Sequence, residues 1–251
     1  MQKFILLAGR RSGTTLFIDC LNSHPDVFCY KRIFGVEKKI KSPDENRHSS
    51  DYFLYRTANL FSIAQYFLSR QASISKFLQT KLDFSNGIKA HGFRVIYSMS
   101  NKYPALFKWA GVEKAKVIHL VRENVLKTYI SEETAKIHKM HHPKKGDIVS
   151  TVKLHINIST IQQTLNNRLH EIEAQRAGCD GLPYLQVTYE SFVERRGVES
   201  KRVLEFLGVD SDIDLKSDLI KINPSNLEDL VENYQELKSE LTGTPLEKLL
   251  N

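Results

Sequence analysis

The sequence of 251 residues has no apolar run near the roughly 18 residues that a membrane-spanning helix requires. It has only three cysteines, and their wide spacing forms neither a disulfide framework nor a Cys-x-x-Cys metal site. The N-terminal apolar run from Phe4 to Ala8 is too short for a secretory signal and ends in Gly-Arg-Arg. We therefore expect a cytoplasmic protein whose thiols, Cys20, Cys29 and Cys179, are reduced.

Acidic residues are the scarcer charged class. There are 36 Lys and Arg residues against 29 Asp and Glu residues, a formal net charge of +7, which favours anionic ligands such as nucleotides and sulfated or acidic small molecules. The basic residues are spread along the chain, with small clusters at 38–41 and 141–145, and no nucleic-acid reader motif accompanies them. We therefore expect a nucleotide or another anionic small ligand and no nucleic-acid partner.

No linker, internal repeat or low-complexity tract divides the chain, so we expect a single domain over residues 1–251. Short apolar runs bounded by turn residues predict four buried strands, at Phe4–Ala8, Gly87–Ile96, Lys116–Val121 and Tyr184–Thr188. Helical patterns follow at Thr14–Leu21, Phe53–Phe67, Tyr103–Trp109, Asn124–Ile137, Val152–Gln175, Val198–Leu207 and Leu227–Leu241. This alternation predicts an α/β fold with a central, mostly parallel sheet flanked by helices.

The turn after the first expected strand lacks a lysine that nucleoside-triphosphate loops carry directly after their last glycine. Thr14 occupies that position, and Arg10 and Arg11 precede Gly13 instead. A strand that runs through a glycine turn into a helix directs free backbone N–H groups and the positive end of the helix dipole at an anion. The loop therefore predicts an anion site in which Arg11 supplies the cation.

A second absence lies at the end of the expected strand Lys116–Val121. Nucleoside triphosphatases usually place an aspartate near such a point to hold magnesium, whereas this sequence has Arg122. An arginine repels a metal ion and attracts another anion. The two positions together predict a nucleotide that carries two separate anionic groups and is bound without a metal.

These stretches resemble motifs of the sulfotransferases that use 3′-phosphoadenosine 5′-phosphosulfate (PAPS). Residues 9–15 (GRRSGTT), followed by 21–27 (LNSHPDV), are similar to the loop that binds the 5′-phosphosulfate. Residues 117–131 (VIHLVRENVLKTYIS) resemble the 3′-phosphate motif. Residues 183–193 resemble a strand near the adenine, and 221–237 resemble the C-terminal segment of bacterial members. The matches follow the family's order and span nearly the whole chain, so the resemblance implies its P-loop-like architecture.

The resemblance also implies roles for individual residues, with PAPS as donor and 3′-phosphoadenosine 5′-phosphate (PAP) as product. Arg11 would stabilise the bridging oxygen as the sulfuryl group leaves, and Arg122 and Ser131 would hold the 3′-phosphate. Ser131 lies nine residues after Arg122, where many members have one residue fewer, so Thr128 is an alternative hydroxyl. The remaining residues expected to bind the nucleotide are Arg10, Ser12, Gly13, Thr14, Thr15, Tyr189 and Lys221.

The general base is less clear from the sequence. Several branches of the family place a glutamate shortly after the segment that resembles His-Pro-Asp-Val, but here Lys31 and Arg32 follow it. His91 resembles the histidine of a Lys-x-His motif that acts as the base in the cytosolic small-molecule branch, and a structural histidine in a strand is an equal alternative. Other candidates are Glu37, Glu132 and Glu133. The histidines at 138, 141 and 142 are read as a basic loop rather than a metal site.

Two alternatives to a sulfotransferase stay open at this point. One is a small-molecule kinase with a degenerate phosphate loop, and the other is a nucleotide-binding homologue that has lost catalysis. The sequence does not identify the acceptor of the sulfuryl group, so a carbohydrate, a lipid-linked hydroxyl and a small metabolite are all candidates. The apolar stretch 52–67 favours core over a substrate wall. The oligomeric state is not readable either.

Overall fold

The computed structural model describes residues 1–35, 51–83, 87–137, 153–219 and 226–250. Five parallel strands form one sheet in the order β2-β3-β1-β4-β5. This confirms the predicted α/β class with a central parallel sheet. The strands are β1 (Gln2–Ala8), β2 (Val27–Tyr30), β3 (Ala90–Ile96), β4 (Lys116–Val121) and β5 (Tyr184–Thr188).

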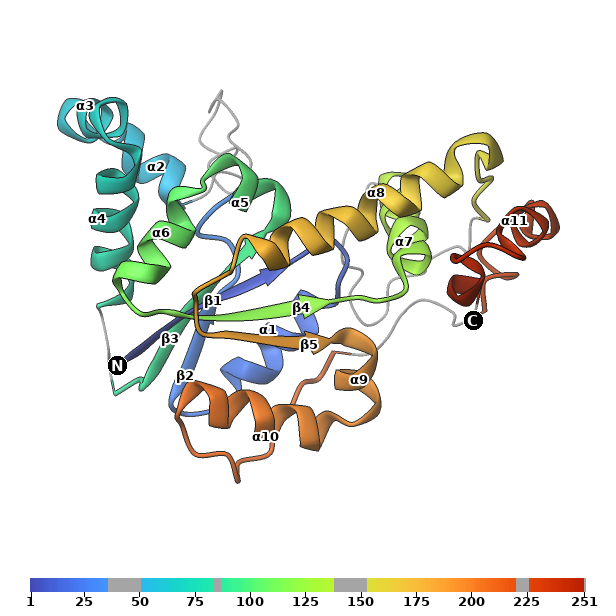
Figure 1. The fold of residues 1–251 in the computed structure, drawn as a ribbon. Coiled ribbons are helices and arrows are strands. Elements are labelled where there is room, and N and C mark those ends of the chain that lie inside the picture. Colours follow the sequence, from blue (N-terminus) through green and yellow to red (C-terminus); the bar gives the residue numbers. More distant parts are fainter. Residues whose placement is uncertain (36–50, 84–86, 138–152, 220–225, 251) are drawn as a thin grey trace.

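Helices cover both faces of this sheet (Figure 1). One face packs on α1 (Thr14–Asn22), α9 (Tyr189–Glu194) and α10 (Arg196–Leu207), through a cluster that includes Phe17, Phe192 and Leu204. The other face packs on α4 (Arg70–Leu82), α5 (Tyr97–Lys102), α6 (Ala105–Val112), α7 (Val125–Ile137) and α8 (Ile158–Ala177). The remaining elements are α2 (Asp51–Thr57), α3 (Leu60–Leu68), α11 (Tyr234–Leu241) and a 3-10 helix at Glu247–Leu250. Within the described ranges, no helix is long and apolar enough to cross a membrane.

Most of the predicted elements are present, but several boundaries were wrong. The stretch predicted as one helix over Phe53–Phe67 is broken at Asn59, whose side chain accepts a hydrogen bond from the Ser62 N–H and so caps α3. The expected helix Val152–Gln175 begins only at Ile158, because Asn157 caps it. The expected helix Leu227–Leu241 is reduced to Tyr234–Leu241. The predicted helix end at Leu207 is confirmed, and Gly208 caps it with a left-handed backbone, φ 76°.

Other elements were missed by the sequence analysis. The edge strand β2 has only four residues, and the helices α5 and α9 have six residues each. The helix α4 was missed although it has 13 residues, because polar side chains interrupt its apolar pattern. The expectation that the stretch 52–67 is core holds for Tyr52, which is buried, but Phe61 and Phe67 are exposed.

The register of the strands aligns their carboxyl ends. Ala8 of β1 lies beside Ile96 of β3 and Leu120 of β4, and Val121 lies beside Thr188 of β5. The residues that directly follow these strand ends therefore meet at one edge of the sheet. Ligands of parallel α/β sheets bind at this edge, where the order of the strands reverses on the two sides of β1.

Candidate functional site

The loop between β1 and α1 has a backbone that is shaped for an anion. Gly13 has φ 80° and Arg11 has φ 59°, both in the left-handed region. The Ser12 hydroxyl donates a hydrogen bond of 2.9 Å to the Gly9 carbonyl, which closes the loop. Thr14 and Thr15 form the first turn of α1, and no acidic side chain lies there. The free N–H groups of this turn are thus left without a competing carboxylate.

Tyr189 packs against the loop at Gly13. A Cβ atom at Gly13 would overlap the ring of Tyr189, so the contact requires glycine for space as well as for its backbone angle. The guanidinium carbon of Arg122 lies 5.0 Å from the centre of the same ring. Tyr189 follows β5 directly, and Arg122 follows β4 directly. The end of β5 therefore supplies one wall for the loop and for Arg122.

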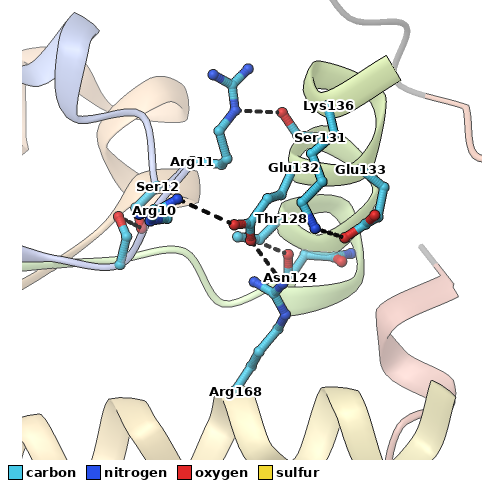
Figure 2. A network of polar contacts seen from close by, with 11 residues as sticks. Arg10, Arg11, Ser12, Asn124, Thr128, Ser131, Glu132, Glu133, Lys136 and Arg168 are labelled. Atoms are coloured by element: carbon cyan, nitrogen blue, oxygen red, sulfur yellow. Dashed lines mark hydrogen bonds and ion pairs between the residues drawn. The ribbon is translucent and has the colours of Figure 1, made fainter. Parts of the chain in front are cut away.

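Arg11 connects the loop to the helix after β4 (Figure 2). Its Nε donates a hydrogen bond of 3.0 Å to the hydroxyl of Ser131, which is buried in α7. Its backbone carbonyl accepts a hydrogen bond of 3.1 Å from Nη1 of Arg122. The hydroxyl of Thr128 instead donates to the Asn124 carbonyl of its own helix. The structure thus brings Arg11, Arg122 and Ser131 together.

Arg94 belongs to the same site and was missed by the sequence analysis. It extends from β3, and its Nη1 donates a hydrogen bond of 3.2 Å to the hydroxyl of Thr14 at the start of α1. The one available signal was a single cation in the otherwise apolar stretch that ends β3 (FRVI). That signal alone does not tell which face of the sheet the side chain occupies.

The arginines of this site are partly buried, so their positive charges are partly removed from water. Burial lowers the pKa of Arg11, and the nearby Arg122 lowers it further. Burial also lowers the pKa of Arg94, with a further contribution from Arg32, which is itself exposed beyond β2. Burial lowers the pKa of Arg122, and its Nε is buried without a hydrogen-bond partner among the described residues. A bound anion would relieve both the repulsion and the missing hydrogen bond.

A cavity of about 410 Å³ adjoins the loop. Its walls come from the loop, from the start of α5, from α7 and from one face of α8. The α8 residues repeat at helical spacing, so their side chains form one stripe. The lining mixes charged and apolar groups and consists of Gly9, Arg10, Ser12, Tyr97, Ser98, Arg122, Val125, Thr128, Glu132, Thr164, Asn167, Arg168, Glu171 and Ile172.

Two glutamates of α7, Glu132 and Glu133, differ in their partners (Figure 2). Glu132 pairs with Arg168 at 2.8 Å and with Arg10 at 3.8 Å, so two cations hold its carboxylate. Glu133 pairs with Lys136 at 2.6 Å on its own helix and does not line the cavity.

Glu171 lines the cavity and makes no hydrogen bond or ion pair with another described residue. Burial raises the pKa of Glu171, although Arg168 lowers it. Burial raises the pKa of the Tyr97 phenol, which contacts the backbone of Gly9, and the nearby Glu171 raises this pKa further. Neither Arg168 nor Glu171 was predicted from the sequence, because both lie on a polar helix face that is typical of a solvent surface.

Three polar side chains, those of Tyr97, His119 and Tyr184, form a hydrogen-bonded network beside the cavity. The hydroxyl of Tyr97 and the hydroxyl of Tyr184 each lie 2.7 Å from a ring nitrogen of His119, which has no exposed surface. Burial lowers the pKa of His119 to about 4, so the ring is neutral near pH 7. These hydrogen bonds link β4 to β5 and hold Tyr97 against the loop.

His91, a candidate base in the sequence analysis, is not brought to the loop. It lies at the start of β3 in register with Lys3 of β1, whereas the loop begins after Ala8, the last residue of β1. Its Nδ1 lies 2.9 Å from the Leu82 carbonyl, and its ring stacks on Tyr30. These contacts support the structural role that was the alternative for this histidine.

Several other predicted residues lie outside the described ranges. They are Glu37, Lys221, the basic clusters at 38–41 and 141–145, and the histidines at 138, 141 and 142. Lys31 and Arg32 are described and exposed. Among the described residues, no group of three His, Cys, Asp or Glu side chains is placed to hold a metal ion.

Known sulfotransferases are similar to this chain in sequence and in fold. A model of the sulfotransferase family matches residues 4–213. The sulfotransferase from Alicyclobacillus acidocaldarius is similar in structure, with 14% identity, coverage of 100% of this chain and 94% of that chain, and a TM-score of 0.52. The sulfotransferase domain of the curacin biosynthetic pathway has 13% identity, coverage of 96% and 98%, and a TM-score of 0.50. Mouse sulfotransferase SULT7A1, solved with PAP, has 15% identity, coverage of 99% and 73%, and a TM-score of 0.48. No curated protein sequence matches the chain.

Proposed function

The chain belongs to the sulfotransferase family, and on that premise we propose that it moves a sulfuryl group from PAPS to a hydroxyl of an acceptor. The observation that carries the proposal is the group of Arg11, Arg94 and Arg122 around the first turn of α1. Three cations at a helix N-terminus suit a nucleotide with anionic groups at both its 5′ and 3′ positions. The buried Arg122 Nε, which lacks a partner among the described residues, supports the fit to a second phosphate.

The proposed roles follow from the positions of these residues. PAPS supplies an activated sulfuryl group on its 5′-phosphate. Arg11 and the loop N–H groups stabilise the charge that develops on the phosphate oxygen as the sulfur–oxygen bond breaks. Arg122 and Ser131 hold the 3′-phosphate. The other nucleotide contacts come from Arg10, Ser12, Gly13, Thr14, Thr15, Arg94, Tyr189 and, outside the described ranges, Lys221.

We assign the cavity beside the loop to the acceptor. It shares Gly9, Arg10 and Ser12 with the loop, so an acceptor bound there would lie next to the 5′ end of the donor. The acceptor oxygen bonds to sulfur while its proton passes to a base. Glu171 is our candidate, because Glu132 is held by two arginines and Glu133 lies outside the cavity.

A thermal-shift titration with PAP, ADP and Mg-ATP tests the cofactor. A ligand at a hundredfold excess over its Kd adds about 2.7 kcal/mol of stability, which raises the Tm of a chain of this size by roughly 5–10 °C. We expect that rise with PAP. The variant Arg122→Gln should respond to PAP no more than to ADP, because it loses the 3′-phosphate contact, whereas Lys108→Gln, an exposed control, should respond like the parent protein.

The same titration separates the alternatives. A rise with Mg-ATP alone would support the kinase and contradict the sulfotransferase proposal. Arg122 stands where a kinase of this build would need a metal-binding carboxylate, which argues against that outcome. A rise with PAP but no transfer of radiolabelled sulfate to any member of a panel of saccharides, phenols and alcohols would support the inactive homologue.

A further inference from the structure

The helix α3 exposes an apolar face that the fold does not cover. Leu60, Phe61, Phe67 and Leu68 are 85%, 66%, 79% and 87% exposed. We call these four residues the α3 face. Leu60 and Phe67, like Phe61 and Leu68, are seven residues or about two helical turns apart, which places the four side chains on one side of the helix. In Figure 1, α3 lies at the outer end of the arm formed by α2, α3 and α4, away from the sheet. A contiguous exposed patch of this kind marks an interaction surface.

The charged residues within α3 and α4 are all cations. Residues 52–82 contain no Asp or Glu, and their four cations are Arg56, Arg70, Lys76 and Lys81. Lys81 pairs with Asp51, so its charge is balanced. Arg70 and Lys76 are exposed: Lys76 Nζ lies 4.8 Å from the ring centre of Phe61, and Arg70 lies over Tyr66. Among the described residues of α3 and α4, an apolar surface with exposed cations beside it complements an anionic, apolar partner.

We propose that the α3 face docks the protein on an anionic lipid surface. An interfacial helix places its Phe and Leu side chains at the boundary between headgroups and acyl chains, while nearby Lys and Arg side chains bind anionic headgroups. The exposed phenylalanines and leucines and the exposed Arg70 and Lys76 meet both requirements. The inference concerns peripheral binding and is independent of the sulfuryl transfer proposed above.

A second copy of the chain is the main competing occupant of the α3 face. In a symmetric dimer the same surface of each copy faces the other. Arg70 and Lys76 of one copy would then approach the same cations of the other copy, with no acidic residue in 52–82 to offset them. Like charges brought together in this way oppose association. The absence of acidic residues therefore favours the anionic membrane.

Flotation of the full chain with lipid vesicles tests this proposal without any donor or acceptor. We expect the protein to float with vesicles that contain phosphatidylglycerol and to bind much less to pure phosphatidylcholine. The double variant Phe67→Gln, Leu68→Gln should lower the partition coefficient by about 100-fold, since each buried side chain of this size is worth about tenfold or more. The matched control Val112→Gln changes an apolar side chain that is 74% exposed on α6 and should leave binding unchanged.

A second pair of variants tests the charge. The double variant Arg70→Gln, Lys76→Gln should weaken binding to the anionic vesicles, and added salt should weaken binding of the parent protein in the same way. Lys108→Gln, on α6, is the matched control. Failure of the parent protein to float with anionic vesicles would overturn the proposal, as would undiminished binding of the Phe67→Gln, Leu68→Gln variant. A dimer in light scattering that this variant dissociates, without vesicle binding, would assign the α3 face to a second copy.

Discussion

The Nε atom of Arg11 donates a hydrogen bond of 3.0 Å to the hydroxyl of Ser131. This bond joins the loop after β1 to α7 across 120 residues of sequence. The same Arg11 offers its carbonyl to Arg122, so one residue of the loop is tied to both residues expected at the 3′-phosphate. These two hydrogen bonds hold the loop in its strained, left-handed backbone at Arg11.

Replacing Arg11 with glycine separates the effect of its side chain on sulfuryl transfer from its effect on folding stability. Glycine adopts the observed φ of 59° without the cost of about 1–2 kcal/mol that another residue bears there. We expect the unfolding free energy of Arg11→Gly to change by less than about 1 kcal/mol, because the relief of strain offsets the lost hydrogen bond. Sulfuryl transfer should fall by roughly 100-fold or more, because the developing charge loses its cation. Urea unfolding and a radiolabelled transfer assay measure the two effects.

Lys114→Gly is the matched control for this variant. Lys114 has φ 52° and, with Arg11, is one of the two non-glycine residues with a positive φ in the part of the chain that the structure describes. The control should gain about 1 kcal/mol of stability and keep its transfer activity. Full activity of Arg11→Gly would contradict the role that we propose for the guanidinium.

Gly13→Ala should disrupt the loop through Tyr189. The added methyl would overlap the ring of Tyr189, and a φ of 80° is unfavourable for alanine. We expect a loss of at least about 2 kcal/mol of unfolding free energy and loss of PAP binding. In the background of Tyr189→Ser the overlap is removed, so only the backbone cost of about 1–2 kcal/mol should remain. A double-mutant cycle with no coupling energy would show that the two residues do not make this contact in solution.

Glu171→Gln tests the proposed base. We expect kcat to fall by about 100-fold or more, while PAP binding measured by thermal shift is unchanged. Because burial raises the pKa of Glu171, the kcat of the parent protein should decline below a pH that lies above the ordinary glutamate pKa. The carboxylate is the active form, so activity is lost as pH falls through this pKa, and the variant should lack that decline.

Glu133→Gln is the control, since Glu133 pairs with Lys136 and does not line the cavity. It should keep the kcat and the pH profile of the parent protein. Glu132→Gln should act differently from both: it releases Arg10 and Arg168, so we expect KM for the acceptor to rise more than kcat falls. An unchanged kcat in Glu171→Gln would contradict the assignment of the base.

The sequence was sufficient for the features that depend on neighbouring residues. The loop at 9–15 follows a buried strand, and its glycine, hydroxyls and cations coincide within one turn, so the sequence alone predicts an anion site there. Arg122 was predicted on the same basis, as a cation at the end of an apolar strand. Parallel pairing then aligns the strand ends, which brings these two predicted positions together.

The features that the sequence did not predict depend on contacts between distant segments. Arg94 is a single cation in a strand, and only the register and the face of β3 direct it to Thr14. Arg168 and Glu171 lie on α8, whose polar stripe is that of an ordinary surface helix until it packs beside the loop. The case of His91 is the reverse. Its local motif suggested a general base, but the strand register places it at the end of β3 that lies away from the loop.

The buried network of Tyr97, His119 and Tyr184 predicts that the folded protein loses stability in acid. The pKa of His119 is about 4 in the folded protein, compared with about 6.5 for an unperturbed histidine. The unfolded state therefore binds a proton between these values that the folded state excludes, so stability is full above about pH 6.5 and falls as pH falls toward 4. Linkage gives a loss of about 2 kcal/mol at pH 5 relative to pH 7.5.

Urea unfolding of His119→Gln at pH 7.5 and pH 5 measures how much of the acid-induced loss of stability comes from His119. The glutamine amide reaches toward the same two hydroxyl groups but does not titrate. We expect the variant to be less stable at pH 7.5 and to show a drop toward pH 5 that is about 2 kcal/mol smaller than that of the parent protein. His170→Gln, at an exposed position on α8, should show the parent's full drop. An equal drop in His119→Gln would mean that His119 does not remain neutral in the folded protein, and that carboxylates elsewhere account for the acid sensitivity.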